Sequence, residues 1–381
     1  MPPTSQTDPT TRAPEIEYQD FSLRVHSQTK RRRLPLGGSL EVTFRCNFRC
    51  IHCYCVNEKP KQDLSLAEIR HLLDQMADEG CLWLLLTGGE PLLRPDFPEI
   101  YQYARHKGMI TTVFTNASLV TDEIADLLGR LKPFVVEISL YGFSPETYQT
   151  VTGRAENFAR VLEGLDRLQH RGVPVKLKSM ILRQNIEDLP LLREYAEARG
   201  LPYRFDPVLN PTLSGSTQPE DLMLSPEEIV RLDLEDAERL KGWREFCDKF
   251  TFACDDGRLY KCGAGQWGFH IDPEGKLSLC MFARQQQYDL RQGSFHEAFY
   301  DFLPQVLAQK ETRVTRCASC EIRSLCGQCP GWAYLHSGDQ EKPVDYLCRL
   351  AHARAKAFGV AVKPSLPPNE KLYEPIAEQG S

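Results

Sequence analysis

The chain has 381 residues, of which 41% are hydrophobic and 26% are charged, so it can bury a sizeable core, and a disordered or fibrous protein is excluded. Its formal net charge of −6 is modest for this length and gives no general electrostatic reason to expect a nucleic-acid partner. No apolar stretch is long enough to cross a bilayer, and the polar N-terminus lacks the apolar core of a secretion signal. We therefore expect a cytoplasmic protein that binds neither nucleic acid nor a membrane, with residues 1–35 as a disordered or extended tail.

From residue 36 to residue 212, short β-branched runs alternate with amphipathic segments of helix length. This alternation requires parallel strands joined by crossover helices, hence an α/β fold with either a β/α barrel or a doubly wound sheet. The predicted strands are residues 39–44, 82–87, 109–115, 134–140, 175–182 and 202–208, and the predicted helices are residues 65–80, 97–108, 121–131, 155–171 and 186–199.

Beyond residue 212 the composition changes. Residues 213–250 are predicted to be a linker and one bridging helix over 225–246, opened by Ser225. The next segment, 251–358, is rich in cysteine and contains two predicted hairpins, at 251–262 and 269–280, each with a Gly-containing turn. Residues 359–381 are predicted to be a tail.

Fourteen cysteines in a reducing compartment favour metal binding or catalysis over disulfides. Cys46, Cys50 and Cys53 have the spacing C-x3-C-x2-C directly after the first predicted strand, where β/α folds place their active sites. Structural zinc normally takes four ligands, often from two C-x2-C pairs, and this segment has one such pair. Three thiolates suit a [4Fe–4S] cluster whose fourth iron stays open; buried packing and zinc are the alternatives.

The segment CNFRCIHC, followed by TGGEP at residues 87–91, resembles the radical S-adenosylmethionine (radical SAM) superfamily. The resemblance implies a partial (β/α)6 TIM-like barrel in which Cys46, Cys50 and Cys53 ligate a [4Fe–4S] cluster. It also implies that S-adenosylmethionine chelates the fourth iron and is cleaved to a 5′-deoxyadenosyl radical. Cys55 and Cys81 are then expected to be packing residues, because a fourth thiolate would close the open iron.

The resemblance also implies contacts to the cofactor. Gly88, Gly89 and Glu90 match the motif that meets its amino group, where glycines permit close approach and the carboxylate offsets the ammonium charge. Asn116 and Ser139 lie at strand ends where the family places polar contacts, Ser139 at the ribose; a turn residue and an ordinary buried hydroxyl are the alternatives. His52 occupies the position near the adenine that is commonly aromatic.

The cysteines beyond residue 250 resemble the SPASM extension of radical SAM enzymes, a small cysteine-rich α+β domain that holds two auxiliary [4Fe–4S] clusters. In one departure from that pattern, two residues rather than three separate Cys326 from Cys329. Cys247 is expected in the core, Cys254 is a ligand or a free thiol, and zinc is the alternative to the clusters. The resemblance implies that one cluster is ligated by Cys262, Cys280 and Cys329, with Cys254 as the candidate fourth ligand. It implies that the other is ligated by Cys317, Cys320, Cys326 and Cys348.

Most relatives with this extension modify peptides, so we expect modification of a ribosomally made peptide or protein. Radical chemistry on a small molecule, such as a sugar alcohol or a tetrapyrrole side chain, is the second reading, and a non-enzymatic zinc or electron-transfer protein is the third. The expected partners are an external one-electron donor of the flavodoxin or ferredoxin type and a separate peptide-recognition protein. Met281 follows Cys280, where sulfatase maturases have an Asp base. Glu137 and Asp206 are candidate bases, but salt-bridged strand residues are the more usual outcome, so no catalytic residue is assigned.

Overall fold

The computed structural model describes residues 17–29, 32–55, 62–248, 257–317 and 320–360, together with the backbone of 374–375. The chain divides into two compact units, Met1–Leu34 and Pro35–Ser381. In the first unit, helix α1 (Tyr18–Thr29) occupies part of the segment for which a disordered or extended tail was expected. Tyr18, Phe21 and Val25 recur at a helical spacing, and this signal was missed because Leu23 departs from it and the rest of the segment is polar.

Six strands of the second unit form the predicted parallel sheet. Five fall inside their expected bounds, and the first begins two residues and ends three residues before the expected 39–44. Neighbouring strands pair in chain order, β1 with β2 through to β5 with β6. The sheet is not closed into a full barrel. The strands are β1 (Gly37–Glu41), β2 (Trp83–Thr87), β3 (Ile110–Thr115), β4 (Val135–Ser139), β5 (Val175–Met180) and β6 (Tyr203–Asp206).

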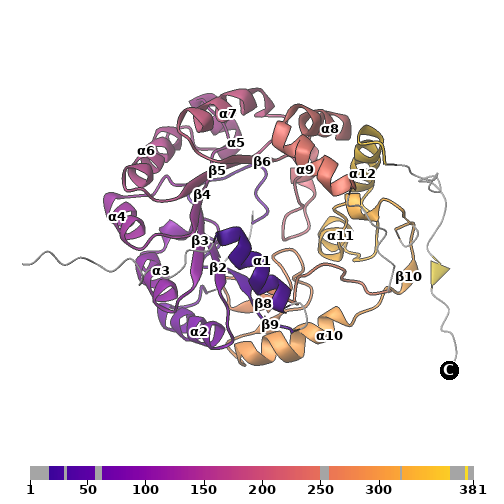
Figure 1. The fold of residues 1–381 in the computed structure, drawn as a ribbon, viewed down its shortest axis with the longest axis horizontal. Helices are drawn as coiled ribbons and strands as arrows, with labels where there is room; N and C mark the ends of the chain where they lie inside the picture. The colour runs from indigo at the N-terminus through magenta and orange to yellow at the C-terminus, as the bar shows by residue number, and fades with distance from the viewer. Residues whose placement is uncertain are drawn as a thin grey trace, which may run out of the picture. The chain divides into compact units, whose positions relative to one another are not determined.

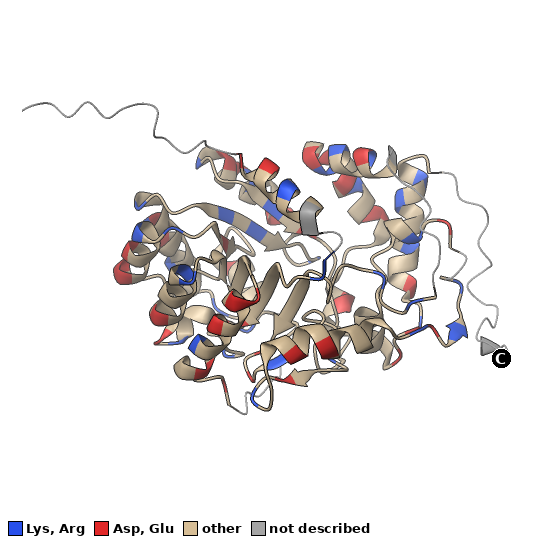
Figure 2. Cartoon of the chain, turned by 60° about the horizontal axis from the view of Figure 1, so that its bottom comes forward, with Lys and Arg blue, Asp and Glu red and all other residues tan. Residues whose placement is uncertain are grey.

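Helices lie outside these strands (Figure 1), and their apolar faces form the core with the sheet. Helix α2 begins at a capping box in which Ser65 and Glu68 bond reciprocally, as its sequence predicts. Acidic and basic residues are interspersed along the helices (Figure 2). The helices of this part are α2 (Leu66–Asp78), α3 (Phe97–His106), α4 (Asp122–Arg130), α5 (Pro145–Thr152), α6 (Asn157–His170) and α7 (Leu189–Ala198).

Apolar and polar residues alternate along β4 and β5. Val136, Ile138 and Leu177 are fully buried, whereas the intervening positions include Glu137 and Lys178. Because successive strand residues point to opposite faces and the helices cover the outer face, the polar residues of these strands face the barrel interior.

The cysteine-rich segment continues the same sheet. Strand β7 (Gly268–Ile271) pairs in parallel with β1, and β8 (Lys276–Ser278) and β9 (Tyr288–Asp289) follow antiparallel. The β7–β8 pair is the predicted hairpin at 269–280. The sheet therefore crosses the expected domain boundary at residue 251 without interruption.

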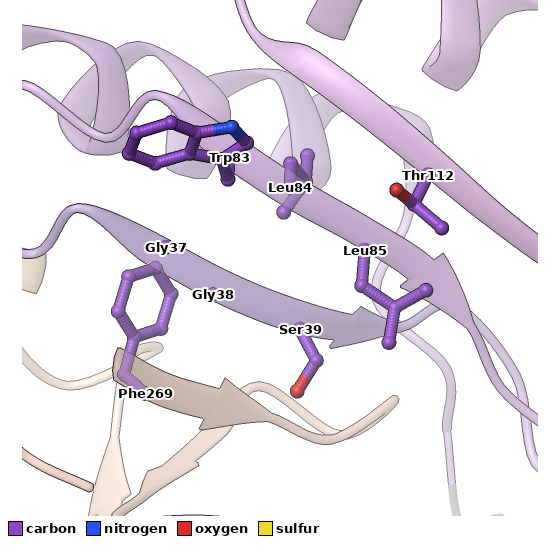
Figure 3. A pocket seen from close by; sticks show the side chains of 8 residues that line it. All are labelled: Gly37, Gly38, Ser39, Trp83, Leu84, Leu85, Thr112 and Phe269. Carbon is purple, nitrogen blue, oxygen red and sulfur yellow. The ribbon is translucent and has the colours of Figure 1, made fainter. Parts of the chain in front are cut away.

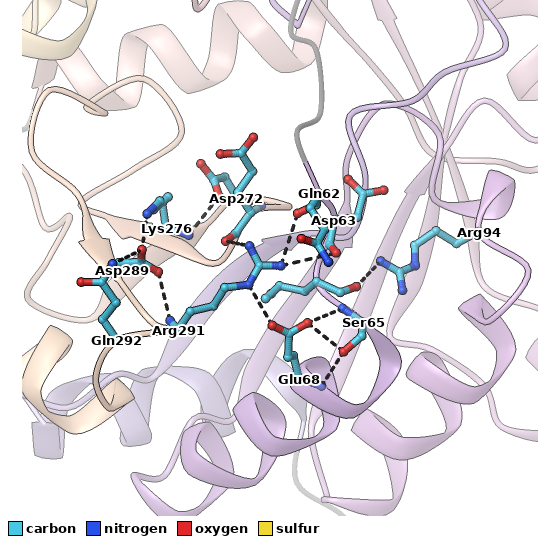
Figure 4. Close-up of polar contacts among 12 residues, drawn as sticks. Gln62, Asp63, Ser65, Glu68, Arg94, Asp272, Lys276, Asp289, Arg291 and Gln292 are labelled. Carbon is cyan, nitrogen blue, oxygen red and sulfur yellow. Dashed lines mark hydrogen bonds and ion pairs between the residues drawn. The ribbon is translucent and has the colours of Figure 1, made fainter.

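Arg291, just after β9, connects this segment to the first part of the barrel. It donates from Nε to Glu68 Oε1 on α2 (2.8 Å) and from Nη2 to the main-chain oxygens of Gln62 (3.3 Å) and Asp63 (3.5 Å), as Figure 4 shows. The cysteine-rich segment is thus attached to the barrel at the start of α2 as well as through β1.

Some predicted elements differ from the structure. The single helix expected over 225–246 is two helices, α8 (Pro226–Glu235) and α9 (Ala237–Asp248), separated by Asp236, whose extended conformation and Oδ1 bond to Arg239 N interrupt the first helix and begin the second. Helix α5 was not predicted. Of the hairpin expected at 251–262, only residues from Gly257 on are described; there Arg258 bridges to Lys310.

The rest of the C-terminal segment is built from short pieces. A turn of π-helix (Glu297–Phe302) leads into α10 (Leu303–Leu307), and β10 (Arg313–Val314) pairs with β11 (Glu374–Pro375). Helix α11 (Pro330–Ser337) was not predicted, whereas α12 (Asp345–Ala357) corresponds to the last short helix expected. Across the parts of the chain that are described, no helix has the length and apolarity needed to span a membrane.

Candidate functional site

Two loops lie side by side at the carboxyl edge of the sheet. The segment after β1, residues 42–55, contains the first cysteines and is called the cysteine loop below; residues 88–91 follow β2. Gly89 N donates to Thr43 O (2.7 Å), and Glu90 N donates to Arg45 O (2.8 Å). The TGGEP segment is therefore fixed against the cysteine loop by its backbone.

The two glycines of TGGEP are required by this contact. A Cβ on Gly88, whose φ is +147°, would lie 2.3 Å from Thr43 O, and one on Gly89 would lie 2.4 Å from Arg45 O. The sequence argument had assigned these glycines to close approach of a cofactor. The structure gives them a further reason, the close approach of one loop to the other.

The thiols of Cys46, Cys50 and Cys53 come together on the cysteine loop. Burial raises the pKa of Cys46 to about 12 and that of Cys50 well above its usual value, and neighbouring thiolates of the set raise both pKa values further. Cys46 and Cys50 are therefore protonated at pH 7 unless a cation compensates the charge of their thiolates, so the donor set suits a metal cluster. In the described residues, no three His, Cys, Asp or Glu side chains already stand in finished metal-binding geometry.

Asn47 anchors the cysteine loop to the end of β3. Its Nδ2 donates to Ser118 Oγ (2.8 Å), and its Oδ1 accepts from Asn116 Nδ2 (2.9 Å). Arg154 Nε donates to Asn47 O (3.2 Å). The Asn116 side chain therefore serves in part to hold the cysteine loop in place. Asn47, Ser118 and Arg154 were missed from the sequence, although Asn47 stands inside the CNFRC motif.

Glu90 is fully buried beneath the loops. Its carboxylate accepts from Leu92 N, Thr115 Oγ1 and Asn116 N at 2.7–3.0 Å. Burial nevertheless raises its pKa to about 7. An ammonium group placed beside this carboxylate would favour its charged form, which is compatible with the role implied by the resemblance.

His52 is buried against Tyr141, with ring centroids 4.6 Å apart in an edge-to-face arrangement. Its Nδ1 has no hydrogen-bond partner, and burial lowers its pKa to about 4. The ring is therefore neutral at pH 7 and presents an aromatic surface. Ser139 lies at the end of β4 and interacts with Tyr141.

The later cysteines fall into two groups. In one, Cys262 raises the pKa of Cys280, and both raise the pKa of Cys329, whose value burial lifts to about 11. These are the three thiols expected to serve one auxiliary cluster. Cys254 lies outside the described residues.

In the second group, burial raises the pKa of Cys326 to about 12, and the three other thiols raise it further. Cys81 is buried in the core as expected, and Cys247 packs against a small separate core. Cys55 is buried as well, but its thiol makes a hydrogen bond with that of Cys53 and therefore lies next to the first three cysteines. The second group consists of Cys317, Cys320, Cys326 and Cys348.

A buried ion pair joins the two cysteine regions. Arg284, four residues after Cys280, donates from Nη2 to Glu41 Oε2 (2.6 Å) at the end of β1. Burial alone would raise the pKa of Glu41, but His270 and Arg284 lower it to about 2. Tyr54 OH also donates to Glu41 Oε1 (3.2 Å). No sequence signal linked these residues, because Glu41 and Arg284 are far apart in the chain.

A pocket of about 330 Å³ lies elsewhere, towards the amino ends of β1 and β2 (Figure 3). Gly37, Gly38, Leu84 and Phe269 form much of its wall, and it contains neither the thiols nor the TGGEP loop. In β/α barrels the chemistry is placed at the carboxyl ends of the strands. We therefore assign the functional site to the cysteine loop and not to this pocket.

The comparisons with known proteins bear on the family and the fold. The family model described as the Radical SAM superfamily matches residues 40–196. The AdoMet-dependent heme synthase of Methanosarcina barkeri (strain Fusaro / DSM 804) is 26% identical over 327 residues, covering 80% of this chain and 94% of that protein. The PqqA peptide cyclase of Granulibacter bethesdensis (strain ATCC BAA-1260 / CGDNIH1) is 28% identical over 336 residues, covering 84% and 88%.

Among solved structures, Streptococcus suis SuiB bound to S-adenosylmethionine superimposes with a TM-score of 0.66 at 18% identity, covering 86% of this chain and 81% of that one. This similarity shows that the fold is shared. The partial barrel implied by the resemblance is thereby confirmed.

Proposed function

We propose that this chain, a member of the radical SAM superfamily, is an iron–sulfur enzyme that modifies a ribosomally made peptide or protein. The observation that carries the proposal is the contact between the two loops, which holds Cys46, Cys50 and Cys53 beside the TGGEP backbone at the carboxyl edge of the sheet. Members of the family bind S-adenosylmethionine and a [4Fe–4S] cluster, which when bound supply a 5′-deoxyadenosyl radical that abstracts hydrogen from an unactivated carbon.

The residues of this chain would hold that cofactor in the following way. Cys46, Cys50 and Cys53 would ligate the cluster and leave one iron to the methionyl end of the cofactor. Glu90, with Gly88 and Gly89 in its loop, would balance the cofactor's ammonium charge. His52 would offer its neutral ring to the adenine, and Asn116 and Ser139 would make polar contacts.

The two later cysteine groups would hold two auxiliary [4Fe–4S] clusters. Their support is the division of seven described thiols into two groups whose members perturb one another's pKa. Residues 36–212 would then carry the radical chemistry and residues 251–358 the auxiliary clusters, with 213–250 connecting them. A cytoplasmic enzyme of this kind would take its electron from a flavodoxin or ferredoxin and would use a separate peptide-recognition protein.

The peptide substrate is supported by the PqqA peptide cyclase, a relative aligned over most of its own length. A tetrapyrrole side chain is the second candidate, because the aligned heme synthase is covered over 94% of its length. In both cases the reaction begins with hydrogen abstraction, and the two candidates differ in the molecule presented to the barrel.

The proposal is tested by anaerobic purification, iron and zinc determination, and measurement of 5′-deoxyadenosine after reduction with dithionite. The wild type is expected to hold iron and to release the nucleoside. The triple change of Cys46, Cys50 and Cys53 to Ala should abolish the nucleoside and leave iron bound at the later cysteines. Cys81→Ala, which removes a buried thiol outside the site, is the matched control and should retain activity.

Two results would contradict the proposal. One is a protein that holds only zinc and yields no nucleoside, which would favour the zinc or electron-transfer reading. The other is nucleoside formation that survives the triple change.

A further inference from the structure

Three charged side chains meet on the inner face of β4, β5 and β6. Lys178 is the register neighbour of both Ser139 on β4 and Arg204 on β6. The Glu137 carboxylate lies 2.6 Å from Arg204 Nη2 and 3.8 Å from Lys178 Nζ. Two cations thus share one carboxylate.

The sharing is unequal. Arg204 makes a short charge-assisted hydrogen bond to Glu137, whereas the Lys178 contact is longer than a hydrogen bond. Glu137 is therefore a salt-bridged strand residue, as carboxylates at such positions usually are. This ion pair argues against a role for Glu137 as a free general base. Lys178 retains donor capacity that Glu137 does not satisfy.

The Lys178 side chain is largely buried. It is 18% exposed, and its Nζ stands 2.9 Å from the centroid of the Phe114 ring. Burial lowers its pKa to about 7; Glu137 raises the pKa, and Arg204 lowers it. An ammonium group in such a site is stabilised by any further anion that reaches it.

We propose that Lys178, assisted by Arg204, binds a carboxylate group of the substrate inside the barrel, next to Ser139. This inference rests on the proposed function, since it places a substrate within reach of the cofactor end of β4. An acidic side chain of a peptide and a propionate of a tetrapyrrole both carry this group. Glu137 stays paired with Arg204 when the ligand is absent, and the cluster carries a net positive charge whenever Lys178 is protonated.

The cofactor's own carboxylate is a less suitable ligand. Its amino acid end belongs at the open iron, among the cysteines and the TGGEP loop. Lys178 lies on β5 next to Ser139, and Glu90 raises its pKa, so the binding of S-adenosylmethionine to Lys178→Met decides between the two carboxylates.

The test measures equilibrium binding to anaerobically prepared, full-length enzyme loaded with iron and S-adenosylmethionine, without reductant. One pair of probes is the capped peptide Ac-Ala-Gly-Glu-Gly-Ala-NH2 and its Gln counterpart. The other pair is coproporphyrin III and its tetraamide. Titration calorimetry is expected to show that the acid of one pair binds about tenfold or more tightly than its amide, and the pair that shows the preference identifies the source of the carboxylate.

Lys178→Met should remove this preference, and Lys178→Arg should restore most of it. Lys178→Met is expected to fold, because Glu137 keeps Arg204. Lys107→Met is the matched control: it removes a lysine paired with Asp74 on the outside of the barrel and should leave the preference unchanged. If Lys178→Met does not fold, a rise in the pKa of Lys178 in the wild type on addition of the acid, followed by NMR of isotopically methylated lysines, provides the same evidence.

The inference is overturned if neither acid binds more tightly than its amide, if Lys178→Met keeps the preference, or if Lys178→Met abolishes binding of S-adenosylmethionine. The first two results can occur in an enzyme that still produces 5′-deoxyadenosine, so they leave the proposed function standing. Conversely, a carboxylate preference in a protein that never produces the nucleoside would contradict the proposed function alone.

Discussion

The cysteine loop and the C-terminal cysteine segment, residues 257–360, both gather thiols, but they rest on different supports. The cysteine loop is bound through its backbone to the loop after β2 and to the last residues of α5, at the edge of the large barrel core. The C-terminal thiols lie on turns and short helices, and several pack only against small separate cores. The geometry of the first site is therefore set by the fold of the barrel, whereas the stability of the C-terminal cysteine segment depends on the metal that its thiols bind.

Removing metal should separate the two regions most clearly. An iron chelator is expected to lower the amide-exchange protection of residues 317–348 by about a hundredfold or more, since a core this small depends on its metal. Strands β2–β5 should keep their protection. Hydrogen exchange measured under anaerobic conditions checks both. Equal loss in the two regions would contradict the comparison.

The next largest effect is expected from Glu41→Gln, which breaks the buried pair between the regions. Of its carboxylate partners, Arg284 would keep only the longer contact with Asp272, at 3.6 Å, and loss of the Glu41 charge should cost about 3–5 kcal/mol of unfolding free energy. Glu68→Gln is the matched control: Arg291 lowers the pKa of Glu68 to about 2 as well, but this carboxylate is 39% exposed, so its loss should cost at most about 1 kcal/mol.

The same pair predicts a pH dependence. The pKa of Glu41 is lower in the folded protein, about 2, than its ordinary 4.5, so the carboxylate stabilises the fold fully above about pH 4.5. This contribution, roughly 3 kcal/mol, is lost as the pH falls from about 4.5 to 2. Denaturant titrations over that range should show the slope in the wild type and a reduced slope in Glu41→Gln.

Gly89→Ala tests the contact between the loops. Its Cβ would lie 2.4 Å from Arg45 O, and the overlap should cost about 1–3 kcal/mol and lower iron binding at the first cysteines only. Gly242→Ala, on α9 with nothing within 4 Å of the added carbon, should be neutral or stabilise by up to about 1 kcal/mol. Iron content and thermal unfolding of both variants distinguish a local clash from a general effect of alanine.

The smallest effect is expected from Tyr54→Phe. It removes one hydrogen bond to Glu41 while keeping the ring contact with Phe282, whose centroid is 5.8 Å away, so about 1 kcal/mol should be lost. Tyr334→Phe, at a side chain 41% exposed, should change the unfolding free energy by less than about 0.5 kcal/mol. Similar losses in the two variants would show that Tyr54 does not link the regions.

The sequence predicted the repeating part of the fold well, because strand and helix periods are local properties. The positions of β1 to β6 follow from β-branched runs, and the start of α2 follows from Ser65 and Glu68. Short helices such as α5 and α11 were missed, since eight residues carry too little periodicity. The break at Asp236 was missed because the apolar pattern continues across it.

Site residues that stand in contiguous sequence motifs could be named from the sequence, whereas partnerships between residues that only folding brings together were missed. The three cysteines and Glu90 stand in contiguous motifs. The partnership of Arg284 with Glu41, and that of Lys178 with Arg204, joins residues brought together only by the sheet. The roles of Gly88 and Gly89 in loop contact likewise needed coordinates, because a glycine pair looks the same whether it faces a ligand or a backbone.

The pairing of β1 with β7 has a consequence for synthesis on the ribosome. β1 is among the earliest segments to emerge, yet the strand that covers its free edge is not made until residues 268–271. Until then the nascent barrel presents an unprotected row of amides and carbonyls, the usual starting point for misassembly with another chain. Truncation before β7 is therefore expected to yield an aggregating protein rather than a smaller folded enzyme.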